Sequence, residues 1–154
     1  MEKLIWPQWY CRVHRKPIED NGDVLVCPGG DWFPRRNGIP RFVTNSRYAD
    51  AFGAQWNRYT RTQLDSYTGS PMTRDRARRC IGERLWSELD GKQLLECGCG
   101  AGRFTEILLS KGACVSSIDL SDAVDANQEN FPQCETHRIA QADVLQLHFC
   151  FKAV

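Results

Sequence analysis

The sequence has no run of about 18 apolar residues, which is the length that a membrane-spanning helix needs. Residues 1–9 contain neither the apolar core nor the small-residue cleavage site of a signal peptide. These absences predict a cytoplasmic protein that neither spans a membrane nor is secreted. The 8 cysteines would suggest disulfides in a short secreted protein, but a reducing compartment predicts that most are small buried hydrophobes.

A strong net charge is also lacking, since 20 Lys and Arg face 19 Asp and Glu. The first ninety residues carry 15 basic and 11 acidic side chains, a balance of +4, and residues 91–154 carry 5 and 8, a balance of −3. A basic segment can attract nucleic acid, but this excess is too small to predict such a partner. Nothing in the composition indicates the oligomeric state.

The chain has three segments of different texture, and its 154 residues fit one domain or a small domain with part of a larger one. Residues 1–45 are rich in Pro, Gly, Trp and Cys, with turn signals at 21–22, 28–30 and 37–38, which predicts a small β module. Residues 46–90 are predicted to be a helical lead-in. In residues 91–154, segments with a strand pattern alternate with segments with a helix pattern.

Two helices are predicted in the lead-in. Four aromatic residues recur at helical spacing and predict one packed stripe: Tyr48, Phe52, Trp56 and Tyr59. Ser70 and Pro71 then suit the cap and first turn of an amphipathic helix that ends near Gly91. Its apolar face is predicted to hold Ala77, Ile81, Leu85 and Leu89.

In the last segment we expect strands at 93–97, 113–119 and 136–142, helices at 103–111 and 121–130, the second capped by Ser121, and the start of a fourth strand at 149–154. Strands linked by short helical crossovers imply a parallel sheet. The predicted fold is therefore an incomplete, Rossmann-like α/β sheet of three to four strands. It follows the zinc-ribbon-like β module and the helical lead-in.

The most informative motif is Gly98-x-Gly100-x-Gly102, directly after the first predicted strand of that sheet. Such glycines let the backbone turn sharply into a helix and let a ligand approach closely. A dinucleotide loop would have Gly or Ala where this chain has Arg103, and a P-loop would continue with Gly-Lys-Ser/Thr. Glu96 would repel a pyrophosphate but suits a cofactor with an ammonium group and no phosphates. S-adenosylmethionine is such a cofactor.

Two further acids follow the next two predicted strands, where open α/β sheets bind ligands. Asp119 can accept hydrogen bonds from both ribose hydroxyls of a nucleoside, and Leu120 can pack on its adenine. Asp143 can accept a hydrogen bond from the adenine amino group. Each acid alone could equally be a helix cap or a solvated loop charge, but the three together in this order favour a binding site.

Residues 94–147 resemble the first half of a class I S-adenosylmethionine-dependent methyltransferase of the type-11 group. The stretches that carry this resemblance are 95–105, 118–121, 123–126 and 141–144. It implies methyl transfer to a small-molecule acceptor and a cofactor site made of Glu96, Gly98, Cys99, Gly100, Gly102, Asp119, Leu120, Asp143 and Val144. Residues 48–66 are similar to an aromatic lead-in of some members, which predicts that Phe52, Gln55 or Trp56 covers the cofactor.

No catalytic residue can be named from the sequence. Enzymes of this family have a seven-stranded sheet whose fourth-strand loop faces the acceptor, and we expect this chain to be a fragment that ends before it. A non-catalytic module that binds the cofactor or docks a protein or RNA partner is the alternative function. A nicotinamide-dependent oxidoreductase is disfavoured by Glu96 and Arg103.

The β module carries a candidate zinc site. Cys11 and His14 have the spacing of metal ligands, and Cys27 supplies a third. No Cys or His follows Cys27 closely, so Asp31 is the candidate for the fourth position. The alternative is a degenerate ribbon without metal, held together by Trp6, Trp9, Trp32 and Phe33.

Overall fold

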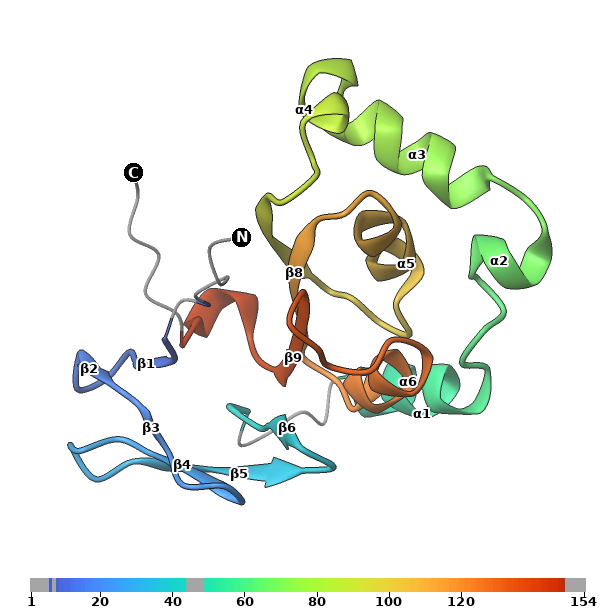
Figure 1. Cartoon of the computed structure of the whole chain (residues 1–154). Helices are drawn as coiled ribbons and strands as arrows, with labels where there is room; N and C mark the ends of the chain where they lie inside the picture. Colours follow the sequence, from blue (N-terminus) through green and yellow to red (C-terminus); the bar gives the residue numbers. More distant parts are fainter. Residues whose placement is uncertain (1–5, 7, 44–48, 149–154) are drawn as a thin grey trace.

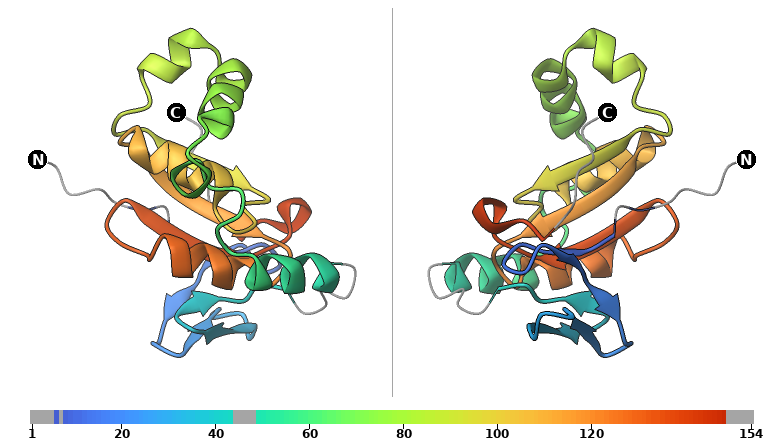
Figure 2. Two further views of the ribbon diagram at one scale, coloured as in Figure 1. Left: turned by 90° about the vertical axis from the view of Figure 1, so that its right-hand side faces the viewer. Right: turned by 90° about the vertical axis from the view of Figure 1, so that its left-hand side faces the viewer.

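The computed structural model describes residues 6, 8–43 and 49–148. The strand predicted at 149–154 and the first aromatic residue of the predicted stripe, Tyr48, lie outside this part of the chain. Figure 1 shows the order of the elements, and Figure 2 shows the parallel sheet between the N-terminal strands below and the helical segment 72–87 above. No helix in the described ranges is long and apolar enough to cross a membrane.

The N-terminal segment is a small β module, as predicted. β1 (Tyr10–Cys11) pairs with β2 (Lys16–Pro17) as a short antiparallel hairpin. β3 (Glu19–Asp20), β4 (Val24–Val26), β5 (Trp32–Arg36) and β6 (Ile39–Pro40) follow as an antiparallel meander. Asn37 and Gly38 have φ of 53° and 75°, so they form the type of tight hairpin turn that the Asn-Gly pair predicts.

The second half is a three-stranded parallel sheet in the order β7-β8-β9, which confirms the Rossmann-like arrangement. β7 (Gln93–Cys97), β8 (Cys114–Asp119) and β9 (His137–Gln141) are joined by α5 (Arg103–Ser110) and α6 (Ala123–Asn130). A short 3-10 turn, η1 (Val144–Gln146), follows β9. The register aligns Cys97 with Ile118 and Asp119 with Gln141, so the carboxyl ends of the strands share one edge.

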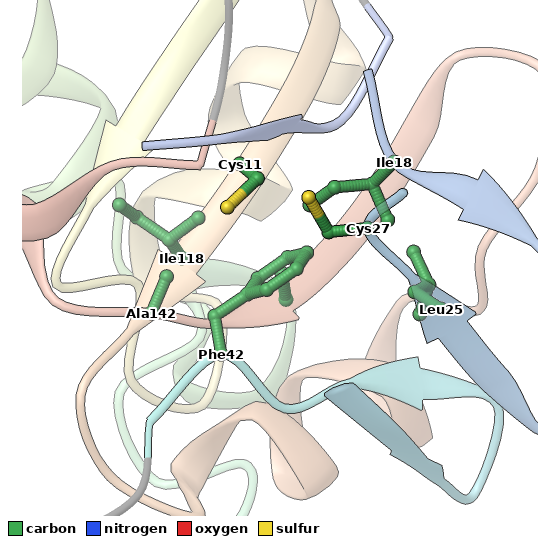
Figure 3. Close-up of a cluster of buried hydrophobic side chains, with 8 residues drawn as sticks. Cys11, Ile18, Leu25, Cys27, Phe42, Ile118 and Ala142 are labelled. Carbon is green, nitrogen blue, oxygen red and sulfur yellow. The ribbon is translucent and has the colours of Figure 1, made fainter. Parts of the chain in front are cut away.

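The two faces of this sheet are covered by different parts of the chain. Side chains alternate between faces along each strand, so Glu96, Ser117 and Ile139 lie in one row, on the face that α5 and α6 cover. The neighbouring row includes Ile118 and Ala140, which pack against the β module. Figure 3 shows this shared core, which contains Cys11, Ile18, Leu25, Cys27, Phe42, Ile118, Ala140 and Ala142.

The β module also lies along the outer edge of β9. Arg41 forms a parallel bridge with Gln141, and the backbone N–H of Phe42 donates to the Gln141 carbonyl at 2.9 Å. The Arg41 side chain is 3% exposed and pairs with Asp125 at 2.7 Å and Asp122 at 3.6 Å. The module thus shares both core and edge with the sheet. The domain boundaries 1–45, 46–90 and 91–154 stay predictions.

The lead-in differs from the single long helix predicted after Ser70. It comprises α1 (Asp50–Arg58), α2 (Asp65–Thr68), α3 (Met72–Ile81) and α4 (Glu83–Ser87). The predicted helix is wrong at Gly82, whose φ of 83° and ψ of 151° break it. Leu85 is 54% exposed as a result, while Trp86 and Leu89 pack with Ala77 and Ile107 beside β8.

The predicted aromatic stripe is also only partly correct. Phe52 is 56% exposed and Tyr59 is 49% exposed, whereas Trp56 is half-buried. α1 contacts the start of α6 through Gly53. The two backbones are so close there that a Cβ on Gly53 would lie 3.1 Å from the Asp122 backbone nitrogen. Close approach of the two backbones therefore orients α1, more than aromatic packing does.

The cap of α3 comes from Asp65 and not from Ser70. Its Oδ1 and Oδ2 accept hydrogen bonds from the backbone N–H groups of Thr73 and Arg74, both at 2.9 Å. Burial raises the pKa of Asp65, but these two donors and the charge of Arg103 outweigh it, and the net pKa is lowered. The carboxylate thus stabilises α3 above the ordinary pKa of Asp, and the contribution is lost as the pH falls through the lowered value.

We expect Asp65→Ala to lower the free energy of unfolding by about 1–2 kcal/mol near neutral pH, because it removes the acceptor of two backbone N–H groups at the start of α3. Urea unfolding followed by circular dichroism measures this. Asp75→Ala, at an exposed acid in the first turn of the same helix, is the matched control. Equal losses in the two variants would contradict the capping role.

Candidate functional site

The glycine loop turns through three positions that disfavour any side chain. Gly98, Gly100 and Gly102 have φ of 75°, 51° and 99°. The N–H groups of Gly98 and Cys99 both donate to the Ile118 carbonyl, at 2.8 and 3.0 Å. The loop after β7 is therefore held against the end of β8.

Packing also requires that residue 102 has no side chain. A Cβ there would lie 2.7 Å from the Phe131 ring and 3.3 Å from the Asn127 amide nitrogen. α5 can approach the end of α6 this closely only with glycine at its start. This position is structural in the described chain, and a direct role for Gly102 in cofactor binding stays a prediction.

Asp119 connects the loop to the start of α6. Its Oδ2 accepts from the Gly100 N–H at 2.9 Å, and its Oδ1 accepts from the N–H and hydroxyl of Ser121 at 2.8 and 2.7 Å. The predicted cap is displaced by this contact: α6 begins at Ala123, with Asp122 preceding it and Ser121 Oγ accepting the Ala123 N–H. A carboxylate has about four lone-pair sites, so it can still accept from a ligand.

A cavity of about 230 Å³ lies over the loop. Four of the predicted cofactor residues line it: Gly98, Cys99, Gly100 and Asp119. The rest of its wall is formed by Ala101, Arg103, Phe104 and the lead-in residues Trp56, Thr60, Gln63 and Leu64. It is below the roughly 300–1,000 Å³ of typical small-molecule sites, so a ligand the size of a nucleoside must extend beyond it. An open hollow of about 740 Å³ beside α6 contains none of the predicted cofactor residues.

The lead-in forms a lid on this cavity. The sequence predicted that Phe52, Gln55 or Trp56 would cover the cofactor, without choosing among them. A Cβ on Gly100 would lie 3.6 Å from Trp56 Nε1, so the indole covers the loop. The Asn130 amide donates to the Thr60 and Ala101 carbonyls at 2.7 and 2.9 Å and thereby ties lid and loop together. Of the three lid candidates, Trp56 lines the cavity, while Phe52 and Gln55 are exposed.

Arg103 is a site residue that sequence reasoning used only to exclude a dinucleotide loop. It lines the cavity, and its Nε donates to Thr73 Oγ1 at 3.0 Å. The contact holds the guanidinium between α3 and the glycine loop. The cavity therefore has one carboxylate, Asp119, and one permanent cation, Arg103. Its position directly after the last glycine was the only available sequence signal.

Glu96 lies behind the loop and not in the cavity wall. Its side chain is nine-tenths buried, and Oε2 contacts the hydroxyls of Thr105 and Ser117 at 2.5 and 3.0 Å. No partner for Oε1 exists among the described residues. Burial raises the pKa of Glu96 to about 7, and the charge of Asp119 adds to it. The orphan oxygen is an acceptor that a ligand or water could satisfy, but its contact with a cofactor stays a prediction.

The remaining predicted residues are not in the cavity wall. Asp143 Oδ1 accepts from the Leu145 N–H at 2.8 Å and so caps η1. Val144 is 52% exposed, and Leu120 is partly buried beside Asp119. They follow β8 and β9 at the same edge of the sheet as the glycine loop, and their roles with adenine stay predictions.

The predicted metal ligands of the β module are brought together. Cys11, His14 and Cys27 have ligand atoms that all lie within 4.8 Å of one another. Asp31 Oδ2 lies 3.2 Å from Cys11 Sγ and 3.1 Å from His14 Nδ1. All seven described cysteines are free thiols; four are buried and three, Cys80, Cys97 and Cys134, are exposed.

Residues 95–153 match the family model of a methyltransferase domain. This match confirms the resemblance predicted from the sequence. It covers the end of β7, the glycine loop, β8 and β9, and is consistent with a class I S-adenosylmethionine-dependent enzyme. No curated protein matches the chain.

Proposed function

We propose that this chain binds S-adenosylmethionine over the glycine loop and supplies the methyl-donor site of a methyltransferase. The observation that carries the proposal is the juxtaposition of Gly98, Gly100 and the Asp119 carboxylate in one cavity. The family match supports methyl transfer as the reaction. A small molecule is the proposed methyl acceptor, as the resemblance implies.

The side chains at the cavity fit this ligand. Asp119 would accept hydrogen bonds from the ribose hydroxyls, and Arg103 would pair with the carboxylate of the methionine part. Trp56 would cover the ligand from the lid side. Leu120, Asp143 and Val144 would hold the adenine, and Glu96 would offer its orphan Oε1 to the ammonium group. No pyrophosphate is accommodated in this scheme, because the Asp119 carboxylate in the cavity wall would repel it.

When bound, S-adenosylmethionine supplies a methyl group on a positively charged sulfur that a nucleophile can displace in line. The chain's own contribution is orientation: the loop and lid fix the donor, and lid closure over Gly100 excludes water from it. We name no residue that deprotonates an acceptor. Oxidoreductase chemistry with a nicotinamide is disfavoured by the acid at position 96 and by Arg103.

Ultraviolet crosslinking of the chain to S-adenosylmethionine with a tritiated methyl group tests the proposal. We expect labelling that unlabelled S-adenosylhomocysteine suppresses and NAD does not. Labelling that NAD suppresses equally, or that heat-unfolded protein also gives, would overturn it.

Trp56 should contribute to affinity as the covering side of the site. We expect Trp56→Ala to weaken S-adenosylhomocysteine binding by about tenfold, because a buried aromatic contact is worth about 1–1.5 kcal/mol. Phe52→Ala, one turn earlier on the same helix and exposed, is the control and should bind like the unchanged chain. Equal affinities of the two variants, measured by fluorescence titration, would contradict the lid role.

A further inference from the structure

We propose that Cys11, His14, Cys27 and Asp31 bind one zinc ion as a structural site, independent of the methyl-donor site. Cys11 ends β1 and His14 lies in the turn that follows it, while Cys27 and Asp31 lie in the turn between β4 and β5. Two thiols, one imidazole and one carboxylate are all ligands that zinc accepts. Cys11 and Cys27 are buried, while His14 and Asp31 have side chains 32% and 38% exposed, which leaves a path for the ion.

The ligand atoms of Cys11, His14 and Cys27 form a compact group, and Asp31 Oδ2 contacts two of them. Zinc–sulfur bonds of about 2.3 Å and zinc–nitrogen bonds of about 2.0–2.1 Å place sulfur and nitrogen about 3.6 Å apart at a tetrahedral angle. His14 Nδ1 lies 3.5 Å from Cys11 Sγ and 3.6 Å from Cys27 Sγ. For nitrogen and oxygen ligands the edge is about 3.4 Å, and His14 Nδ1 lies 3.1 Å from Asp31 Oδ2. One ion could therefore be held by Cys11, His14 and Cys27, and a movement of the Asp31 side chain toward it would complete the fourth position.

Backbone N–H groups are directed at both sulfur atoms of the cluster. The N–H of His14 points to Cys11 Sγ at 3.4 Å, and the N–H of Gly29 points to Cys27 Sγ at 3.3 Å. These contacts stabilise negative charge on sulfur. Gly29 is also required sterically, because a Cβ there would lie 2.2 Å from the His14 ring. The Cys-Pro-Gly-Gly sequence thus fits a turn that closes over a metal ligand.

The ion would give stability to strands that are too short to be stable alone, since β1, β2 and β3 each have two residues. Both cysteines lie in the core cluster that contains Ile118 (Figure 3). The carbonyl of Ile118 accepts the N–H groups of Gly98 and Cys99. Zinc would therefore stabilise the module against the same strand end that holds the glycine loop. With four protein ligands no position is open, so the site is structural and not catalytic.

Metal analysis of the purified full chain, kept reduced, tests this proposal. We expect about one zinc per chain by inductively coupled plasma mass spectrometry, and about none in Cys27→Ser or Asp31→Asn. Cys134→Ser, at an exposed cysteine, is the control and should keep its zinc. Asp31→Cys should also keep zinc, because it creates the common three-cysteine, one-histidine ligand set.

Cobalt replacement in the unchanged chain gives a result that does not depend on how the variants fold. We expect visible bands of tetrahedral cobalt and thiolate-to-cobalt charge transfer, with a stronger charge-transfer band in Asp31→Cys. An octahedral spectrum, or zinc loss in Cys134→Ser equal to that in Cys27→Ser, would overturn the site. A Cys11–Cys27 disulfide that persists in the presence of the reductant, found by mass spectrometry, would also overturn it. S-adenosylhomocysteine binding is measured separately, so failure of the zinc site and failure of the cofactor site can be told apart.

Discussion

Asp119→Ala is expected to weaken S-adenosylhomocysteine binding by about 100-fold or more. A hydrogen bond to a charged group is worth about 1.5–3 kcal/mol, and two ribose hydroxyls would lose such an acceptor. The substitution also removes the contacts of the carboxylate with the Gly100 N–H and with Ser121. Both the ligand's partner and the shape of the loop are therefore affected.

A series of variants separates these two effects in the same binding assay. Asp119→Asn keeps the side-chain volume and one acceptor, so we expect an intermediate affinity. Glu135→Ala, at an exposed acid before β9, controls for the loss of one negative charge and should leave binding unchanged. An affinity for Asp119→Ala within threefold of the unchanged chain would exclude the ribose role. Circular dichroism establishes that each variant is folded.

The second large effect is expected at Glu96, through the pH dependence of stability. Burial raises the pKa of Glu96 from its ordinary 4.5 to about 7. Between these values the folded chain binds a proton that the unfolded chain has released, so this group makes stability fall as the pH rises. The loss amounts to about 2–3 kcal/mol between about pH 5 and pH 8.

The hydrogen bonds around Glu96 give an independent reason for a protonated carboxyl group. His137 Nδ1 lies 2.9 Å from the Phe131 carbonyl, so it must be the donor there. Burial lowers the pKa of His137, which favours the neutral ring, and Nε2 then accepts from the Ser117 hydroxyl at 3.0 Å. Ser117 Oγ also lies 3.0 Å from Glu96 Oε2, and its single proton can be donated either to the imidazole or to the carboxyl group. Ionising Glu96 would force Ser117 to donate to it, which leaves the imidazole Nε2 without its donor.

Urea unfolding of the unchanged chain and Glu96→Gln at about pH 5 and pH 8 measures this effect. We expect the stability of the variant relative to the unchanged chain to rise by about 2–3 kcal/mol over that range. Comparing the two proteins cancels the opposite effect of His137, whose lowered pKa makes stability fall as the pH falls. Glu135→Gln is the control for charge. A constant difference between Glu96→Gln and the unchanged chain would contradict the raised pKa.

The parallel sheet could be predicted because its signals are local. The apolar run before Gly98, the strand pattern at 113–119 and the glycines at 98, 100 and 102 each predict the structure of their own segment. Helical crossovers then leave only a parallel order β7-β8-β9. This order places the ends of β7 and β8 side by side, and Gly98, Cys99, Gly100 and Asp119 accordingly line one cavity.

The other features depend on contacts that are distant in sequence. Asp65 caps a helix that begins seven residues later, and Gly82 ends that helix although the apolar spacing continues beyond it. The burial of Arg41 against Asp125 arises from packing the module on the sheet edge. Trp56 and Arg103 became site residues only when the lid was placed over the loop. Periodicity carries no information on such contacts, because each is set by how separate elements dock.

Calorimetric titration of the purified chain with S-adenosylhomocysteine and, separately, with NAD tests the central claim most directly. Our account predicts one S-adenosylhomocysteine bound per chain and no heat of binding with NAD. Binding of NAD without binding of S-adenosylhomocysteine would contradict it.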